Sequence, residues 1–557
     1  MTKNIVVVGA GYAGVITAKK LANRFRRTDY QIVLIDNHSF FTYMAQLHEV
    51  ATSRVPASHV QVDLGMLFHD TDNVKIVTAS VETLDKAAKQ VITSIGAIEY
   101  EKLVIAIGSS IDDHGVKGVS EYAKSLRSFE DAVDLRQHIK RVVQEGAMAL
   151  DDDERERKLR LVVIGGGFTG VQLVGDMLEQ RRVLAQTNNI KESEISIHLY
   201  EQNPAILSML ADENLVERGE SYLRRHGVFL FKEAKIAEVK EQGIVLESGY
   251  EVKTATVIWA GGTHVNQRGE HWGLKTGPQG RFLVNERMQA EGEDAIYVVG
   301  DAVAYRDPKT IVADDAASGW IPQNIEMGVA AADTAVPNIV YDLLERGQVK
   351  NFTGTYPGYV ISLGSHYALG KVQRFLGIPF KKGLAVSGFT GNMIKHANNL
   401  YFYARLTSGY KMYHYLLDEI FRTADGRTPF FGWTSRRGNV LWSLPLRMLM
   451  GIIWILTASL WGGSIFGLLA ALTGWLLFLG LFTTLAGFFG FVLGMIMVLV
   501  GHGMAASSLL MPLASLALMN GAGRSVGLDF WVIPYLEKRW GKRRYGEHRS
   551  KYNDLDM

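Results

Sequence analysis

The sequence predicts an α/β protein with two Rossmann-like dinucleotide-binding domains, followed by a C-terminal bundle of transmembrane α-helices. Two copies of one pattern predict the α/β part: an apolar strand, a G-x-G-x-x-G turn and a helix occur in this order near residue 9 and again near residue 165. The helical bundle is predicted because residues 448–523 contain no Asp, Glu, Lys or Arg. With 557 residues, the chain is long enough for several domains.

The first pattern begins with a short apolar strand over residues 5–8, of the kind found in parallel sheets covered on both faces. In chain order, its three glycines permit a tight turn, let a phosphate approach the backbone, and let the helix pack closely on the strand. They are Gly9, Gly11 and Gly14. The helix over residues 12–24 would direct the positive end of its dipole at a pyrophosphate. A second strand ends at Asp36, whose carboxylate is expected at a ribose hydroxyl.

The second pattern is equally complete. A strand over residues 159–164 precedes its three glycines, which are Gly165, Gly167 and Gly170. The following strand ends at Glu201, and an acid at this position accepts from the free 2′-hydroxyl of NAD and repels a 2′-phosphate. Because no Arg follows Glu201 closely, the second site is predicted to prefer NADH to NADPH.

A third signal is the strand over residues 295–299, which leads into Gly300 and Asp301. Together with the two glycine patterns, this segment resembles the part of two-dinucleotide-binding flavoproteins that brings an Asp to the ribityl chain of FAD. The segments "EKLVIAIGSS" and "TATVIWAGG" resemble the two crossover strands of that superfamily, and they contain Gly108 and Gly262. The resemblance implies a relay in which one site holds FAD and the other admits NADH.

The order of these segments predicts a discontinuous FAD-binding domain with the NADH-binding domain inserted into it. The acidic stretch "DDDERERK" is interpreted as a solvated linker at the boundary. The predicted regions are the FAD-binding domain over 1–115 and 285–345, a linker region over 116–157, the NADH-binding domain over 158–280, an interface and membrane-surface region over 346–435, the transmembrane domain over 440–525 and a basic cytoplasmic tail over 526–557.

Composition excludes several classes of protein. The chain has no cysteine, so disulfides, redox-active dithiols and cysteine-ligated iron–sulfur clusters are impossible. The formal net charge is +2, which gives no electrostatic footprint for nucleic acid. No metal site is predicted. The apolar run at the N-terminus is too short for a signal peptide, so the first domain is expected to fold in the cytosol.

As a set, the segments "GAGYAG", "QLHEVA", "GGGFTG", "VIWAGG" and "VVGDA" resemble the type II NADH dehydrogenases, which are single-subunit NADH:quinone oxidoreductases. The resemblance covers about residues 1–425. It implies non-covalent FAD, NADH as the substrate and a membrane quinone, menaquinone or ubiquinone, as the acceptor, in an enzyme of the respiratory chain that pumps no protons. The absence of cysteine excludes the thiol chemistry of the similar sulfide:quinone oxidoreductases and disulfide reductases.

Two departures from the family pattern affect the catalytic residues. Family members commonly carry Glu where this chain has Gln172, and an amide holds no proton or charge at neutral pH; Gln172 is predicted to pair with Lys395. Of the family's AQxAxQ quinone motif, only Gln323 remains. Glu326 is a candidate proton donor, although a solvated helix face is the more usual place for a single Glu, and His48 is a further candidate. The predicted catalytic residues are thus Gln172, Lys395, Glu326, Gln323 and His48.

The charge-free tail predicts four membrane spans, with Gly487, Gly490 and Gly494 allowing close helix packing. Basic residues flank it on both sides, at 436–437 and 447 and at 538–544, so both flanks are predicted to be cytoplasmic and the number of spans even. The spans are expected near 444–462, 465–482, 484–502 and 505–521. The segments "PLRMLMGI" and "GAGRSVGLDFWV" resemble the DoxX-like membrane family, which implies little beyond a small helical bundle.

The predicted location is therefore the cell membrane, with several spans and with the catalytic part and the tail on the cytoplasmic side. Tyrosines and basic residues over 395–421 predict helices that lie on the lipid surface. A homodimer through residues 350–425 is a further possibility. Two alternatives to quinone reduction remain open: a flavin redox sensor that regulates the helical tail, and electron delivery to a non-quinone acceptor such as a protein.

Overall fold

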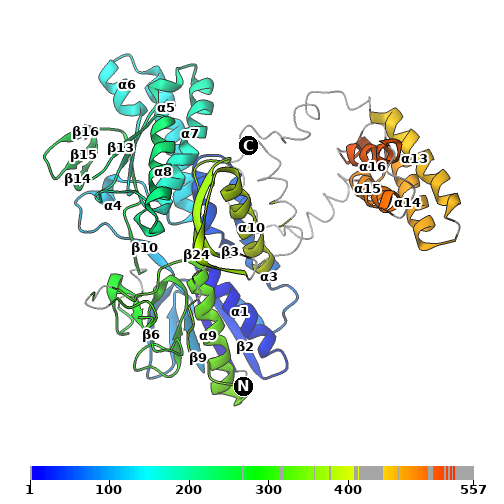
Figure 1. Cartoon of the computed structure of the whole chain (residues 1–557). Helices are drawn as coiled ribbons and strands as arrows, with labels where there is room; N and C mark the ends of the chain where they lie inside the picture. Colours follow the sequence, from blue (N-terminus) through cyan, green and yellow to red (C-terminus); the bar gives the residue numbers. More distant parts are fainter. Residues whose placement is uncertain are drawn as a thin grey trace. The chain divides into compact units, whose positions relative to one another are not determined.

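The computed structural model describes most of the chain, and the chain divides into two compact units, Met1–Leu416 and Leu417–Leu555 (Figure 1). The described residues are 3–265, 269, 271–312, 315, 318–354, 356, 358–375, 378–406, 412, 415, 443–461, 463–499, 506–519, 522–524, 527–529 and 531–532. The two units are described separately below. The predicted basic flanks at 436–437 and 538–544 lie outside the described residues.

The first domain of the larger unit is built on a five-stranded parallel sheet, in the order β20-β9-β1-β2-β5. Its central strands are apolar and fully enclosed, as the continuous apolar runs in the sequence predict. Because β20 pairs with β9, residues far apart in the chain share one sheet, and this pairing makes the domain discontinuous. The strands are β1 (Lys3–Val8), β2 (Tyr30–Asp36), β5 (Val74–Thr78), β9 (Lys102–Ile105) and β20 (Ile296–Val298).

The second domain repeats this architecture with a four-stranded parallel sheet, in the order β13-β12-β11-β17. Each domain also carries a three-stranded antiparallel meander, β6-β7-β8 in the first and β14-β15-β16 in the second. The strands of the second sheet are β11 (Arg160–Ile164), β12 (Ser196–Tyr200), β13 (Val228–Phe231) and β17 (Thr256–Trp259). The meander strands are β6 (Val81–Asp85), β7 (Gln90–Thr93), β8 (Gly96–Glu99), β14 (Ile236–Lys240), β15 (Gly243–Leu246) and β16 (Glu251–Lys253).

Helices cover the sheets and connect the domains (Figure 1). In each domain the first helix begins directly after the glycine turn, and α1 packs against α9. The short helix α2, from the first domain, packs against α5 and α7 and so joins the two domains. These helices are α1 (Tyr12–Arg24), α2 (Leu47–Ala51), α5 (Phe129–Met148), α7 (Phe168–Asn188), α8 (Glu213–Arg225) and α9 (Ile325–Leu344).

The acidic stretch interpreted as a linker is a helix, α6 (Asp152–Leu159), which ends directly before β11. The side chain of Asp151 caps it by accepting from the backbone N–H of Glu154 at 2.9 Å. Three acidic residues lie in the first turn and two basic residues in the last, so the charges complement the helix dipole. The same charges that suggested solvated chain therefore stabilise a surface helix.

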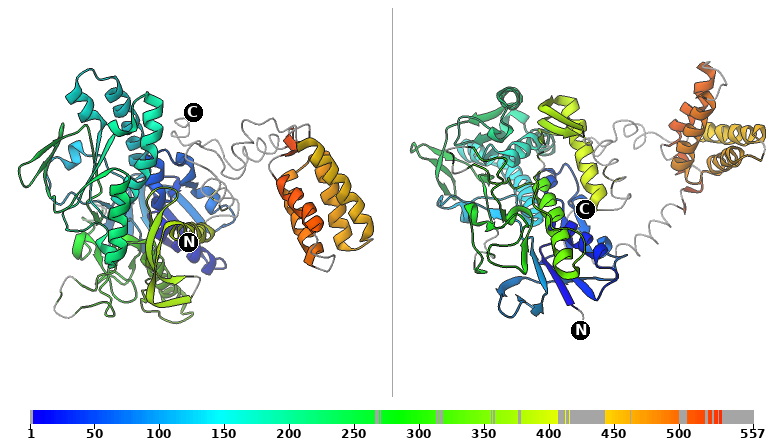
Figure 2. Two further views of the ribbon diagram at one scale, coloured as in Figure 1. Left: turned by 45° about the horizontal axis from the view of Figure 1, so that its top comes forward. Right: turned by 60° about the horizontal axis from the view of Figure 1, so that its bottom comes forward.

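The larger unit ends in a three-stranded antiparallel sheet and a helix that returns to the dinucleotide domains. The strands are β22 (Gly358–Ser362), β23 (Ala368–Phe375) and β24 (Ile378–Ser387), and the helix is α10 (Gly388–Leu406). Figure 2 shows this sheet and helix in yellow-green beside the blue first domain. Contacts of α10 with α1, β22 and β23 place its inner face, including Lys395, close to the start of the chain.

The described part of the smaller unit holds four apolar helices packed side by side (orange to red in Figure 2). They are α13 (Ser443–Leu460), α14 (Ile465–Leu479), α15 (Thr483–Leu499) and α16 (Ala506–Ala517), and they coincide with the four predicted spans. One of them, α13, is both long and apolar enough to cross a membrane, with a mean hydropathy of 1.6. The helices α14 and α15 are apolar but shorter, at 15 and 17 residues.

The predicted glycine packing in this unit is confirmed. A Cβ added at Gly487 or Gly490 would lie 2.7 or 2.8 Å from atoms of Ser515, and one at Gly494 would lie 2.9 Å from Pro512. All three glycines are on α15 and both contacted residues are on α16, so the missing side chains let the two helices approach closely.

Candidate functional site

The first glycine turn connects β1 to α1, and each of its three glycines is needed for a different structural reason. Gly9 has a φ of +101°, which an L-residue rarely adopts, and a Cβ on Gly14 would collide with the carbonyl oxygen of Gly9. Gly11 has an ordinary extended conformation, with φ −69° and ψ −176°, and among the described residues no atom lies within 4 Å of a Cβ added there. Neither backbone conformation nor a close contact in the described part of the chain therefore explains Gly11, and the open space beside it fits a phosphate group at the helix N-terminus.

The second glycine turn, between β11 and α7, has the same geometry. Gly165 has a φ of +109°, and a Cβ on Gly170 would collide with the carbonyl oxygen of Gly165. Gly167 has φ −72° and ψ −175°, and again no atom of the residues that the structure describes lies within 4 Å of an added Cβ. Both turns therefore fit a dinucleotide in the way that the sequence predicts.

Asp36 lies at the carboxyl end of β2 and supports the first turn. Its carboxylate accepts from the backbone N–H of Ala10 at 2.6 Å and from that of His38 at 2.9 Å. The imidazole Nδ1 of His38 lies 3.5 Å from Asp36 Oδ1, so of about four acceptor positions on the carboxylate one remains for a hydroxyl of a nucleotide ribose. The bonds of the His38 side chain to Asp36 and Glu130 raise the pKa of His38 to about 10, although burial opposes its charge.

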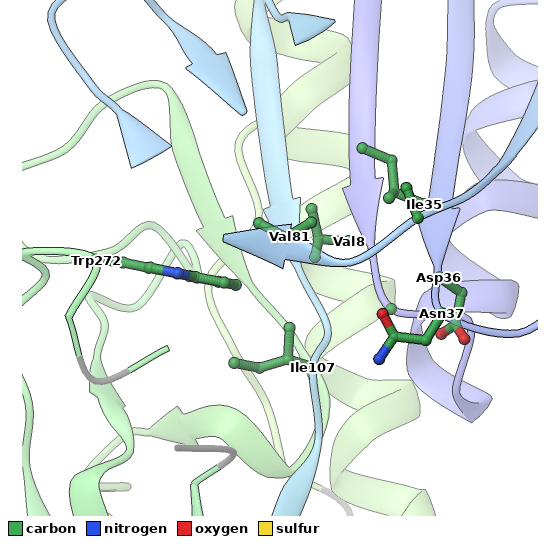
Figure 3. Close-up of a pocket in the computed structure, with 9 residues that line it drawn as sticks. Val8, Ile35, Asp36, Asn37, Val81, Ile107 and Trp272 are labelled. Atoms are coloured by element: carbon green, nitrogen blue, oxygen red, sulfur yellow. The ribbon is translucent and has the colours of Figure 1, made fainter. Parts of the chain in front are cut away.

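A pocket of about 90 Å³ adjoins Asp36 at the carboxyl ends of the parallel strands (Figure 3). Figure 3 shows the Trp272 ring and Ile107 across the pocket from Asp36 and Asn37. The lining residues are Val8, Gly9, Ile35, Asp36, Asn37, Ala79, Val81, Ile107 and Trp272. Flat and aliphatic groups opposite a carboxylate suit a base and its ribose. Trp272 was missed by sequence reasoning because it lies in an irregular segment with no motif.

Glu201 has the equivalent position in the second domain and is similarly bonded. Oε2 accepts from the backbone N–H of Gly166 at 2.6 Å, while Oε1 accepts from the backbone and side-chain nitrogens of Asn203, both at 2.7 Å. Three of about four acceptor positions are thus used, which leaves one for a ligand hydroxyl. The side chain is 7% exposed, so a second anion beside it would meet a poorly screened charge.

Asp301 lies where the chain crosses between the two domains, and residues from several segments bond to it or to its bonding partners. Its side chain accepts from Ser109 Oγ at 3.2 Å, and Arg127 donates to the same hydroxyl at 2.8 Å. Burial raises the pKa of Asp301, and the nearby Arg127 only partly offsets this effect. Gln323 donates to the carbonyl oxygen of Asp301 at 3.1 Å, so the structure brings these two predicted residues together.

The remaining predicted glycines lie around the same position. Gly108 and Gly262 come directly before β10 (Ser109–Ile111) and β18 (Thr263–Val265), which pair with each other and join the two crossover segments. A Cβ on Gly300 would lie 3.1 Å from the Cβ of Ala13 in α1. The crossover strands, the first glycine turn and Asp301 therefore form one site.

His48, Gln172 and Lys395 belong to one buried network, but they are connected differently from the prediction. Lys395 donates to Glu49 Oε1 at 2.8 Å, whereas the amide nitrogen of Gln172 lies 3.2 Å from His48 Nε2. The predicted pairing of Gln172 with Lys395 is wrong because Glu49 offers the lysine a full negative charge, and a neutral amide does not. Arg54 and Asp176 complete the network, and no sequence motif contains either of them.

Glu326 lies in the first turn of α9, close to the N-terminal helix α1. It is partly buried rather than on a solvated helix face, and burial raises its pKa. Burial is the main cause of the raised pKa of Tyr12, and the charge of Glu326 also raises this pKa. A carboxyl group with a raised pKa keeps its proton to a higher pH than an ordinary carboxyl group, as suits a proton donor.

Comparison with known proteins now identifies the fold family. Residues 3–332, more than half of the chain, match the family described as pyridine nucleotide-disulphide oxidoreductase. The chain belongs to this family. The disulphide chemistry in the family's name requires cysteine thiols, and this pyridine nucleotide-disulphide oxidoreductase has none.

Curated relatives of this family member include the type II NADH:quinone oxidoreductases of Staphylococcus saprophyticus and Staphylococcus aureus strain NCTC 8325. Each is 28% identical over 375 residues, which are 66% of this chain and 90% of the relative. Similar solved structures include NDH2 from Plasmodium falciparum in complex with NADH, with a TM-score of 0.65 and 15% identity over 79% of this chain and 99% of that chain. The sulfide:quinone oxidoreductase of Aquifex aeolicus gives a TM-score of 0.58 and 18% identity over 72% and 91%. At these identities, the structures show the shared two-domain fold.

Proposed function

We propose that this protein is an FAD-dependent NADH:quinone oxidoreductase of the type II, non-proton-pumping kind. The observation that carries the proposal is the pair of equivalent nucleotide turns in one unit, each with space for a phosphate beside its middle glycine. Two such sites suit a bound dinucleotide cofactor and an exchangeable dinucleotide substrate. The curated relatives named type II NADH:quinone oxidoreductase support the choice of reaction, since this chain covers 90% of their length.

In this proposal the first domain holds FAD without a covalent bond, and the second binds NADH. Bound FAD supplies two-electron chemistry between a hydride donor and a quinone. The backbone at Gly11 receives the FAD pyrophosphate, Asp36 the ribose, and Asp301 the ribityl chain. Gly167 and Glu201 serve NADH in the same way. Quinol formation needs protons, and Glu326 and His48 are the groups proposed to hold them, with Gln172 and Lys395 in the network around His48.

The membrane is the proposed source of the quinone, and α10 offers a surface for it. Apolar side chains at helical spacing are exposed along one side of α10: Phe389 is 75%, Met393 44% and Tyr401 54% exposed. Arg405 lies in its last turn, as suits a helix on anionic lipid. We propose contact of this face with the cytoplasmic leaflet and four spans in the smaller unit. The homodimer through residues 350–425 stays a prediction.

The decisive experiment is an anaerobic half-reaction series on the purified full-length protein. Addition of NADH is expected to bleach the yellow flavin absorbance, and menaquinone or ubiquinone is then expected to restore it over repeated cycles. A protein without a releasable flavin, or one that NADH does not bleach, would contradict the proposal. A redox sensor would bleach once and remain reduced when quinone is added, so the same series also distinguishes that alternative.

The preference for NADH over NADPH is expected to depend on Glu201. In the Glu201→Gln variant, the ratio of kcat/KM for NADH to that for NADPH should fall about tenfold, a change of about 1.4 kcal/mol, because the 2′-phosphate no longer meets a buried carboxylate. Steady-state rates with both nucleotides measure this ratio. Glu247→Gln removes an exposed carboxylate of the same domain and should leave the ratio unchanged. An equal ratio in the Glu201 variant and the wild type would exclude this role.

A further inference from the structure

Five ionisable side chains form one continuous chain inside the larger unit. Lys395 and Arg54 both bond Glu49 Oε1, each at 2.8 Å, and Arg54 also bonds Asp176 Oδ1 at 2.7 Å. His48 Nδ1 completes the chain at 2.6 Å from Asp176 Oδ2. Side-chain exposure is 8% or less at every member. With His48 neutral, two cations balance two carboxylates, and the chain carries no net charge.

The two carboxylates of the chain are each bonded to cationic side chains. Burial opposes the charge of Asp176, but Arg54 and His48 outweigh it and keep its pKa below the usual value. Glu49 is bound by two cations and also accepts from Gln46 at 2.7 Å, and the guanidinium of Arg54 does not deprotonate. His48 is the imidazole of the chain, and its ring can accept a second proton.

The charged and titratable groups around His48 come from five segments. Its own helix α2 carries Glu49, the loop after α2 carries Arg54, and α7 carries Asp176. Helix α5, which packs against α2, carries the buried Arg136. Helix α10 carries Lys395 and also His396, whose pKa is lowered to about 3, first by burial and then by Lys395. His396 thus stays neutral and does not compete with His48 for a proton.

Gln172 can accommodate both protonation states of His48. His48 Nδ1 lies 2.6 Å from Asp176 Oδ2 and His48 Nε2 lies 3.2 Å from the amide nitrogen of Gln172, which are distances that a neutral imidazole with its proton on Nδ1 satisfies. If Nε2 gains a proton, a half-turn of the amide presents the carbonyl oxygen as the acceptor. Gln172 is the fifth residue of α7, so it lies about 6 Å along the helix axis from the end that carries the second glycine turn.

We propose that His48, positioned by Asp176 and Gln172, takes up a proton from water when the neighbouring redox site gains negative charge. The inference rests on the proposed function. A flavin held at this site would receive two electrons and one proton as hydride from NADH, which would leave as NAD⁺, so the site would gain one negative charge. Protonation of His48 adds one positive charge to a network that is otherwise neutral, and thereby stores the proton for the quinol.

The test is the pH dependence of the flavin midpoint potential in the full-length protein, measured by mediated electrochemical reduction without NADH. Between about pH 5 and about pH 8, the range in which histidine side chains generally change charge, the wild type should show a window in which its potential falls more steeply than that of His48→Gln. The difference expected for one extra proton in a two-electron couple is about 30 mV per pH unit. Parallel curves for the two proteins over the whole range would overturn the proposal.

Two further variants keep the result interpretable. In Gln172→Glu, a carboxylate beside Nε2 stabilises protonated His48 in both redox states, so the steep window should move to higher pH; an unmoved window would contradict the proposal even if His48→Gln lost its flavin. His198→Gln changes a partly buried imidazole outside the network and should leave the wild-type curve intact. Bleaching by NADH is recorded separately, so failure of the proposed function is distinguishable from failure of this inference.

Discussion

Replacing Gly167 by valine is expected to lower kcat/KM for NADH by at least about 100-fold, or about 2.7 kcal/mol, while the protein still folds and still binds flavin. The conformation of Gly167 is open to any residue, and an added Cβ meets no atom in the described part of the chain. The valine side chain is therefore expected to displace the ligand phosphate at the N-terminus of α7. Loss of a glycine at the helix N-cap costs at most about 1 kcal/mol of stability.

Gly11→Val is the matched control, because Gly11 has the same conformation and the same open surroundings in the first domain. This variant should lose flavin, whereas Gly167→Val should keep its yellow colour and resist bleaching by NADH. Absorbance of the purified proteins and anaerobic addition of NADH measure both effects. If Gly167→Val lost its flavin and Gly11→Val kept it, the assignment of the two domains would be reversed.

The sequence predicted those parts of the site that depend on short segments. A glycine turn, the strand before it and the helix after it span fewer than about 30 residues, so Gly9, Gly165 and the acids that follow them are found from one local pattern. Length and apolar composition likewise predicted the four helices of the smaller unit. These features need no knowledge of distant contacts.

The buried network could not be predicted because its members meet only in the folded chain. His48 and Asp176 are 128 residues apart, and Glu49 and Lys395 are 346 apart. The preference of Lys395 for Glu49 over Gln172 depends on which carboxylate the fold leaves beside it, a fact that no spacing encodes. Trp272 is a similar case, since its role follows from its position opposite Asp36 and not from its neighbours in the chain.

The same network predicts an asymmetry in stability. Glu49→Gln is expected to lower the free energy of unfolding of the larger unit by about 3–5 kcal/mol, because it leaves Lys395 and Arg54 buried beside a neutral amide. Lys395→Met should cost less, about 1.5–3 kcal/mol, because Glu49 keeps its bond to Arg54 at 2.8 Å. The two variants are compared by their thermal midpoints of unfolding, monitored through the release of flavin, in the same detergent and at the same pH.

The double variant Glu49→Gln/Lys395→Met separates loss of a charge from loss of packing. Without the carboxylate of Glu49, the buried charge of Lys395 destabilises the fold. Its replacement by a methionine of similar length should therefore restore part of the lost stability, so the double variant should be more stable than Glu49→Gln alone. If Lys395→Met proved more damaging than Glu49→Gln, or if the two effects simply added, Glu49 would not be balancing two cations. The network around His48 would then not be electrically neutral before His48 takes up a proton.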